Sequence, residues 1–246
     1  MPTGLSIPPK PVSQTWRPEL TRLPSRSAFQ RFFRWFMRGF CRLLLFLFTN
    51  LEISGLENYP ENGPALVVIN HLGDADGVLG VAYWPVFTDG FAKVELYDLP
   101  VLGKIIDWIG VIWVHRGQPD RRAITAALEG FRQGRIISIA PEGRESLTGA
   151  LEGGTEGAAF LAWKAKVPIV PVAITGTYND RLYHNMKHLK RTDVTMTVGK
   201  PFLLPDIRDR KLAMEDGTRR IMESLARLLP EELRGNYSYV NTVDEF

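Results

Sequence analysis

A histidine and an aspartate five positions apart, His71 and Asp76, are the residues of this sequence whose types and spacing suggest chemistry. On one continuous helix their side chains would diverge by about 140°, because each residue turns the helix by about 100°. They can meet if His71 lies in the turn that leaves a strand and Asp76 lies in the first turn of the next helix. Gly73 and Gly77 make such a tight path sterically easy.

Such a pair is suited to general base catalysis. An aspartate that accepts a hydrogen bond from one imidazole nitrogen fixes the tautomer of the histidine and stabilises its imidazolium form, which leaves the other nitrogen free to take a proton. No serine or cysteine stands beside the pair, so the proton is expected to come from a hydroxyl of the substrate. A lone histidine after a strand is more often a structural residue. The pair by itself therefore does not decide between a catalytic and a structural histidine.

The elements around the pair alternate between strands and helices. Apolar runs at residues 65–69, 111–114, 136–140 and 169–174 predict buried strands, and residues 194–198 alternate like a half-buried strand. Helical patterns lie between them, at residues 119–134 with Pro119 suited to the first turn, near residues 156–166, and near residues 218–229. We therefore expect an α/β fold with a largely parallel central sheet flanked by helices.

The N-terminal part of the chain differs in composition. Residues 1–25 are rich in proline and polar residues and predict a flexible lead segment. In residues 26–50, four arginines recur at steps of three and four among aromatic and aliphatic residues, which predicts an amphipathic helix. Its longest uninterrupted apolar run, residues 43–48, is far shorter than the roughly 20 residues needed to cross a bilayer. The arginines are Arg31, Arg34, Arg38 and Arg42.

This helix is expected to lie in the membrane interface, with arginines toward the headgroups and aromatic rings toward the acyl chains. The alternative is a core helix with a solvated basic face. Residues 1–50 hold eight basic residues and one acidic residue, a net charge of +7, whereas the whole chain carries +3. A basic arm indicates an anionic partner, either phospholipid or nucleic acid. The aromatic and leucine content favours membrane phospholipid and not nucleic acid.

One block of sequence resembles a known family. The segment NHLGDAD, residues 70–76, fits the NHxxxxD block of the glycerolipid acyltransferase family, whose members acylate glycerol 3-phosphate and lysophosphatidic acid. Three further segments follow in the family's order and at similar separations. They are GVIWVHRG at residues 110–117, APEGRES at residues 140–146 and VPIVPVAITG at residues 167–176. The resemblance covers residues 51–205, so we expect residues 51–246 to form an acyltransferase domain.

The resemblance implies roles for particular residues. It implies that His71 is the base and Asp76 its partner. It also implies that acceptor binding, including contact with a phosphate, falls to Lys93, Arg116, Glu142, Gly143 and Arg144.

Two positions depart from the family pattern. The third block usually reads Glu-Gly-Thr-Arg-Ser, whereas here Arg144 comes one place early and Glu145 occupies the usual place of the arginine. Either Arg144 reaches the same phosphate from a shifted backbone, or Glu145 marks a different headgroup. His115 stands where the second block often has aspartate, and we expect it to be structural.

The implied reaction moves a fatty acyl group from acyl-CoA or acyl-carrier protein to the sn-2 hydroxyl of 1-acylglycerol 3-phosphate, in phospholipid synthesis. Direct transfer without an acyl-enzyme is expected, with no metal or organic cofactor. Because the acceptor is a lysophospholipid, the protein is expected to sit monotopically on the cytoplasmic face of the cell membrane. Two alternatives stay open. One is another acceptor, such as glycerol 3-phosphate or another lysolipid, and the other is a non-catalytic lipid-binding protein.

Overall fold

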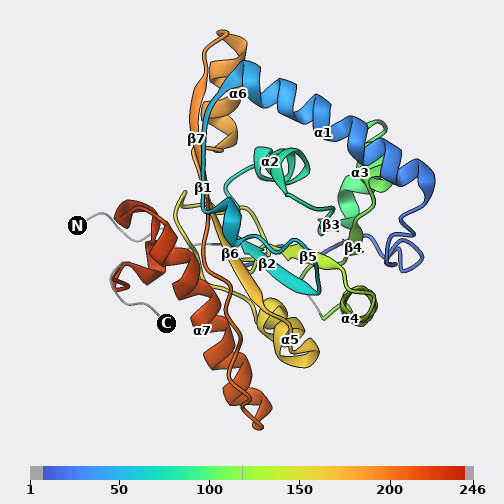
Figure 1. Ribbon diagram of the computed structural model, residues 1–246, viewed down its shortest axis with the longest axis vertical. Coiled ribbons are helices and arrows are strands. Elements are labelled where there is room, and N and C mark those ends of the chain that lie inside the picture. The colour runs from blue at the N-terminus through green and yellow to red at the C-terminus, as the bar shows by residue number, and fades with distance from the viewer. Residues whose placement is uncertain (1–7, 118, 242–246) are drawn as a thin grey trace.

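The computed structural model describes residues 8–117 and 119–241 (Figure 1). Seven strands form one sheet in the order β1-β7-β6-β2-β5-β3-β4. β7 runs antiparallel to β6, and the other neighbouring strands are parallel. The expected α/β fold with a largely parallel sheet is therefore confirmed. The strands are β1 (Thr49–Ser54), β2 (Ala65–Ile69), β3 (Asp89–Lys93), β4 (Ile112–Val114), β5 (Ile136–Ile139), β6 (Ile169–Thr175) and β7 (Thr192–Val198).

Helices cover both faces of the sheet (Figure 1). α1 and α2 contribute to one core, and α4, α5 and α7 contribute to the other. The helices are α1 (Ala28–Phe48), α2 (Ala75–Tyr83), α3 (Leu102–Ile109), α4 (Arg121–Arg132), α5 (Glu156–Ala165), α6 (Asn179–Lys187) and α7 (Arg210–Leu228). Short 3-10 turns lie at Leu56–Asn58, Val94–Asp98, Glu231–Leu233 and Gly235–Tyr237.

The central strand β2 shows why this arrangement positions a site. Its side chains point alternately to the two faces, so that Ala65 and Val67 join the core under α1 and α2, while Leu66 and Val68 join the core under α4, α5 and α7. All four are fully buried. Burial on both faces fixes the register of β2, and with it the place where the chain leaves the sheet just before His71.

The predicted elements are found with changed limits. Strands form at all five predicted places, but β1 and β3 were not predicted. α4 begins after Asp120, whose side chain accepts hydrogen bonds from the N–H groups of Arg122 and Ala123, so Pro119 precedes the helix instead of lying in its first turn. α7 begins at Arg210, a little over two turns before the expected start.

The expected orientation of the arginines on α1 is wrong, because three of the four donate to neighbouring helices of the protein. Arg34 donates to the last carbonyls of α3, and Arg38 and Arg42 donate to the last carbonyls of α2. Helix C-termini leave carbonyls without partners and carry partial negative charge, so they favour guanidinium groups. The accepting carbonyls belong to Ile109, Gly110, Trp84 and Ala82.

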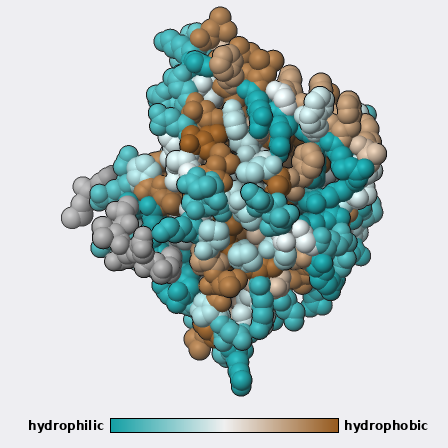
Figure 2. Space-filling view, in the orientation of Figure 1, coloured by the Kyte–Doolittle hydropathy of each residue, from teal (hydrophilic) through white to brown (hydrophobic). Residues whose placement is uncertain are grey.

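The opposite face of α1 is apolar and exposed. Figure 2 shows brown and tan side chains along the upper right rim, where Figure 1 places α1. The surface continues onto α3, because Phe29 and Phe33 contact the ring of Trp108 edge-on. No helix within the described residues is both long and apolar enough to cross a membrane. The exposed large side chains of α1 are Phe29, Phe32, Trp35, Phe36, Phe40, Leu43, Phe46 and Leu47.

The N-terminal segment, expected to be flexible, lies against the rest of the protein from residue 8 onward. The Lys10 ammonium donates to the carbonyl of Gly153 at 2.7 Å. The Ser13 N–H donates to the carbonyl of Arg116 at 2.9 Å, and Leu20 is buried. These contacts place the described part of the segment across the turns that follow β4 and β5. Residues 1–7 of the predicted lead segment lie outside the described residues.

Candidate active site

His71 and Asp76 meet in the predicted geometry. His71 lies in the turn after β2, and Asp76 lies in the first turn of α2. His71 Nδ1 is 2.8 Å from Asp76 Oδ2, which also accepts the N–H groups of Leu72 and Gly73. An acceptor at Nδ1 places the proton there and leaves Nε2 as the basic nitrogen. The turn and the carboxylate thus hold each other in place.

The glycines of this turn have different importance. A Cβ on Gly73 would collide with the carbonyl oxygen of Thr177, so the close approach of the two loops requires glycine there. A Cβ on Gly77 would meet nothing within 4 Å. The sequence expectation is therefore borne out for Gly73, whereas the path of the chain does not require glycine at position 77.

The segment after β6 supports the pair from one side. β6 lies next to β2 in the sheet, and Thr177, two residues beyond its end, donates its hydroxyl to Asp76 Oδ1 at 2.5 Å. Asn70 ties the two strands together, because its side chain exchanges hydrogen bonds with the backbone N–H and C=O of Ile174. Both carboxylate oxygens of Asp76 thereby have hydrogen-bond donors, which fix the orientation of the carboxylate toward His71.

The segment after β5 supports the pair from the other side. Glu142 is fully buried, and its two oxygens accept the backbone N–H groups of His71 at 3.2 Å and Glu152 at 2.7 Å. Burial raises the pKa of Glu142 to about 7, against the two N–H donors, which lower it. Glu142 therefore orients the backbone of the turn that holds His71. The acceptor contact that the resemblance implies for it stays a prediction.

Arg144 does not point toward an acceptor. Its Nε and Nη2 donate to Glu152 at 3.0 and 2.7 Å, and its Nη1 donates to the carbonyl of Pro8 at 2.8 Å. The guanidinium and the carboxylate are both buried. The donors of Arg144 are thus engaged within the protein, and its contact with a phosphate stays a prediction. Gly143, beside it, is exposed and has a left-handed φ of 73°.

Lys93 and Arg116 lie at the same edge of the sheet but farther along it. Lys93 ends β3 and Arg116 follows β4, two and three strands from β2. Neighbouring strands lie about 4.8 Å apart, which places the two backbones roughly 10 and 14 Å from that of His71. The Arg116 N–H donates to the Ser13 hydroxyl at 2.8 Å. The structure thus brings neither cation directly to Nε2.

A carboxylate faces the open nitrogen of the base. Glu145 Oε1 lies 3.9 Å from His71 Nε2, too far for a hydrogen bond. Glu145 Oε2 accepts a hydrogen bond from Asn179 Nδ2 at 3.1 Å. The sequence singles out Glu145 as a departure from the family pattern and as one candidate mark of a different headgroup, but it gives no sign of Thr177 or Glu152.

A second histidine–aspartate pair has the same spacing and a different environment. His115 Nδ1 lies 2.7 Å from Asp120 Oδ2, and both side chains are almost completely buried. His115 Nε2 accepts the N–H of Arg17 at 2.9 Å, and the Trp16 ring packs against the imidazole at a tilt, with 4.4 Å between the ring centroids. Both ring nitrogens therefore have protein partners, which agrees with the expected structural role.

The surroundings of His71 give a pH prediction. Burial lowers the pKa of His71, but the hydrogen bond and charge of Asp76, with the charges of Glu145 and Glu142, raise it by more. A general base must be neutral to accept a proton, so activity should rise with pH through a pKa above the ordinary value of 6.5. Measuring kcat/KM between acidic and alkaline pH checks this. An acid limb at or below 6.5 would contradict the raised pKa.

The chain belongs to the acyltransferase family. A family model described as Acyltransferase matches residues 50–175, just over half of the chain. The matched region contains His71, Asp76 and the whole of the third block. The α/β fold and the paired side chains at the edge of its sheet thus fall within one family match.

Similar proteins have been named for one reaction. The chain is 25% identical over 206 residues to the 1-acyl-sn-glycerol-3-phosphate acyltransferase of Bacillus subtilis, covering 79% of this chain and all of that protein. It is 26% identical over 179 residues to the chloroplastic enzyme of that name from Brassica napus, covering 70% of this chain. The chain spans about half the length of the plant relatives, 51% for Brassica napus and 42% for Arabidopsis thaliana.

The fold also matches a solved structure. The crystal structure of the 1-acyl-sn-glycerophosphate (LPA) acyltransferase PlsC from Thermotoga maritima superposes with a TM-score of 0.63 at 24% sequence identity. The match covers 83% of this chain and 81% of that one. It confirms the arrangement of sheet and helices.

Proposed function

We propose that the protein transfers a fatty acyl group from acyl-CoA or acyl-carrier protein to a free hydroxyl of a lysolipid. One observation carries this proposal: His71 is held by Asp76 at Nδ1, at 2.8 Å, while no described residue lies within hydrogen-bond distance of Nε2. Family membership supplies the reaction class, and the geometry supplies the base.

The proposed step forms one ester and releases one thiol. Nε2 removes the proton of the acceptor hydroxyl as its oxygen attacks the thioester carbonyl carbon. The negative charge of Asp76 stabilises the imidazolium that results. The tetrahedral intermediate collapses, the carbon–sulfur bond breaks, and the proton on Nε2 passes to the leaving thiolate. The base is thereby regenerated without a covalent enzyme intermediate.

The reference acceptor is 1-acylglycerol 3-phosphate, the lipid that appears in the names of the relatives, and the family resemblance implies acylation at its sn-2 hydroxyl. Its acylation would place the protein in phospholipid synthesis. Lys93 and Arg116, at the same edge of the sheet, are the cations that the resemblance assigns to its phosphate.

The reaction is tested with purified protein in mixed micelles. Thiol release from palmitoyl-CoA and from palmitoyl-carrier protein is followed with lysophosphatidate, glycerol 3-phosphate or lysophosphatidylcholine as acceptor, and the ester is identified by mass spectrometry. The proposal predicts thiol and ester in equal amounts, both dependent on a lysolipid. Lipid binding without ester, under every combination of donor and acceptor, would instead favour the non-catalytic alternative.

We further propose that residues 28–48 attach the catalytic domain, residues 51–246, to the cytoplasmic face of the cell membrane. The aromatic face of α1 is the part that would enter the interface, because three of its four arginines are engaged with α2 and α3 on the other side. A long-chain acceptor would then reach the site without crossing water.

Trp35 and Phe36 test this attachment, since 67% and 52% of their surfaces are exposed. Changing both to glutamate should lower the vesicle-bound fraction roughly tenfold or more, because apolar burial in the interface is lost and negative charge is added. Flotation with vesicles that contain anionic lipid measures the fraction. Leu203→Glu, at an exposed leucine after β7, is the control and should still float. Binding to a polynucleotide in place of vesicles would overturn the membrane assignment.

A further inference from the structure

The groove beside His71 is acidic. It has a volume of about 520 Å³ and runs between the segment after β5 and the start of α6. Its lining includes the carboxylates of Glu145, Asp180 and Glu232, and among the described lining residues there is no lysine, arginine or histidine. The described lining thus presents carboxylates to the groove, and one of them, Glu145, also faces Nε2 of His71.

Glu145 holds a fixed position in this groove. Its Oε2 accepts from Asn179 Nδ2 at 3.1 Å, and Asn179 Oδ1 accepts the N–H of Asp74 at 2.9 Å. The Glu145 side chain is 35% exposed, so its Oε1 can be reached from the groove. The carboxylate is thus held in place by its neighbours and remains available to a ligand.

The negative charge extends past Glu145. The Tyr183 hydroxyl donates to Asp74 Oδ2 at 2.7 Å. Burial, followed by the hydrogen bond and charge of Asp74 and the charge of Glu145, raises the pKa of Tyr183 to about 12. The negative charges of Asp74 and Glu145 therefore both reach the Tyr183 hydroxyl on α6.

A phosphate beside the reacting hydroxyl would meet unfavourable charges there. The nearest arginine of the block, Arg144, is paired with Glu152, and Lys93 and Arg116 lie two and three strands from β2. A phosphate next to the reacting hydroxyl would lie close to the Glu145 carboxylate, and the negatively charged oxygens of the two groups would repel each other. Glu145, the carboxylate that faces Nε2, therefore favours a cation at that place and opposes an anion.

We propose that the acceptor carries a protonated amine next to the hydroxyl that is acylated, and that Glu145 selects it. This inference rests on the proposed function. An acceptor oxygen about 2.8 Å from Nε2 and an ammonium nitrogen about 2.8 Å from Oε1 would be close neighbours, because Nε2 and Oε1 are 3.9 Å apart. An amino alcohol has this spacing.

The chemical step stays the same with this acceptor. The hydroxyl oxygen forms the ester bond, the thioester carbon–sulfur bond breaks, and the proton moves through His71 to the thiol. The amine keeps its proton and positive charge, so it has no lone pair with which to attack the thioester. Glu145 contributes binding and orientation to this step.

Three ether lipids with the same hexadecyl chain provide the test, because they differ only at carbon 3 of the glycerol unit. The group there is a phosphate, a hydroxyl or a protonated dimethylamine, which cannot form a stable amide. We expect kcat/KM to be roughly tenfold or more higher for the ammonium lipid than for the hydroxyl lipid, with the phosphate lipid lowest.

Variants at position 145 separate charge from shape. Glu145→Gln keeps an acceptor for Asn179 but removes the charge, and it should cancel the preference for the ammonium lipid. Glu145→Arg should reverse the order in favour of the phosphate lipid. Glu215→Gln, at an exposed acid on α7, is the matched control and should keep the wild-type order.

The outcomes distinguish this inference from the function on which it rests. A wild-type preference for the phosphate lipid that Glu145→Gln leaves unchanged would overturn the amine acceptor, while the acyltransferase function would stand. If none of the three lipids supports ester formation, and the assays with lysophosphatidate also show none, the proposed function fails as well.

Discussion

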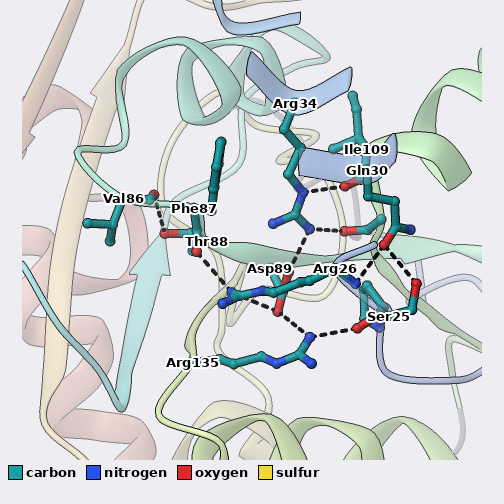
Figure 3. A network of polar contacts seen from close by, with 12 residues as sticks. Ser25, Arg26, Gln30, Arg34, Val86, Phe87, Thr88, Asp89, Ile109 and Arg135 are labelled. Atoms are coloured by element: carbon teal, nitrogen blue, oxygen red, sulfur yellow. Dashed lines mark hydrogen bonds and ion pairs between the residues drawn. The ribbon is translucent and has the colours of Figure 1, made fainter. Parts of the chain in front are cut away.

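Replacing Asp89 with alanine is expected to lower the free energy of unfolding by about 3–5 kcal/mol, the usual cost of leaving buried charges without their partner. Asp89 is fully buried at the start of β3 and accepts hydrogen bonds from three arginines (Figure 3). Its oxygens lie 3.1, 2.6 and 3.3 Å from the guanidinium nitrogens of Arg26, Arg34 and Arg135. The three arginines would be left without a countercharge.

The Asp89 cluster joins α1 to strands β3 and β5 of the sheet. Arg34 comes from α1 and Arg26 from the segment before it, whereas Arg135 precedes β5. Urea unfolding followed by circular dichroism measures the loss. Asp206→Ala is the control, because its contact with Lys166 is exposed on both sides and should contribute at most about 1 kcal/mol. If the two variants are equally stable, the cluster is not what fastens α1.

Asp76→Asn is expected to reduce kcat by about 10²–10⁴, the range that a positioned general base contributes. Asp76 Oδ2 accepts from His71 Nδ1 and from two backbone N–H groups. An amide nitrogen at that place would face three donors, so the histidine would lose its tautomer preference and its orientation.

Asp120→Asn provides a matched control for this prediction. Asp120 makes the same type of pair with His115 after β4 and also caps α4. Both substitutions should lower stability, but only Asp76→Asn should lower the rate per folded molecule. Measuring kcat together with urea unfolding separates the two effects. Equal losses of kcat in both variants would mean that His71 and Asp76 have no special part in the reaction.

The core of the fold could be predicted because its strands are buried on both faces and read as continuous apolar runs. β1 and β3 could not be predicted in this way. β1, TNLEIS, is an edge strand whose burial alternates, and it follows the apolar end of α1 without a break. β3, DGFAK, begins with Asp89 and Gly90, residues that are depleted in strands. Partners from distant parts of the chain stabilise both.

The sequence also could not predict which face of α1 packs against the protein. A stripe of arginines among aromatic residues is compatible with either face against the protein. What decides is the position of the C-termini of α2 and α3, whose free carbonyls meet Arg34, Arg38 and Arg42. That arrangement depends on tertiary contacts, which spacing alone does not record.

One part of the candidate site could likewise be predicted from the sequence, and another part could not. The pairing of His71 with Asp76 is local, five residues apart, and its geometry follows from the turn. The side-chain directions in the third block depend on tertiary contacts. Arg144 pairs with Glu152, eight positions away, while Glu145 faces His71 Nε2. Nothing in the residue types shows which of the two charged neighbours faces the groove.

The most direct test of the account is ester formation by His71→Ala. Wild type and variant are compared at equal concentrations of folded protein, with one thioester and one lysolipid, counting thiol and ester in the same reaction. The account predicts that the wild type forms both in equal amounts and that His71→Ala loses at least about 10²-fold of the rate. Ester formation by His71→Ala at the wild-type rate would contradict the assignment of His71 as the base.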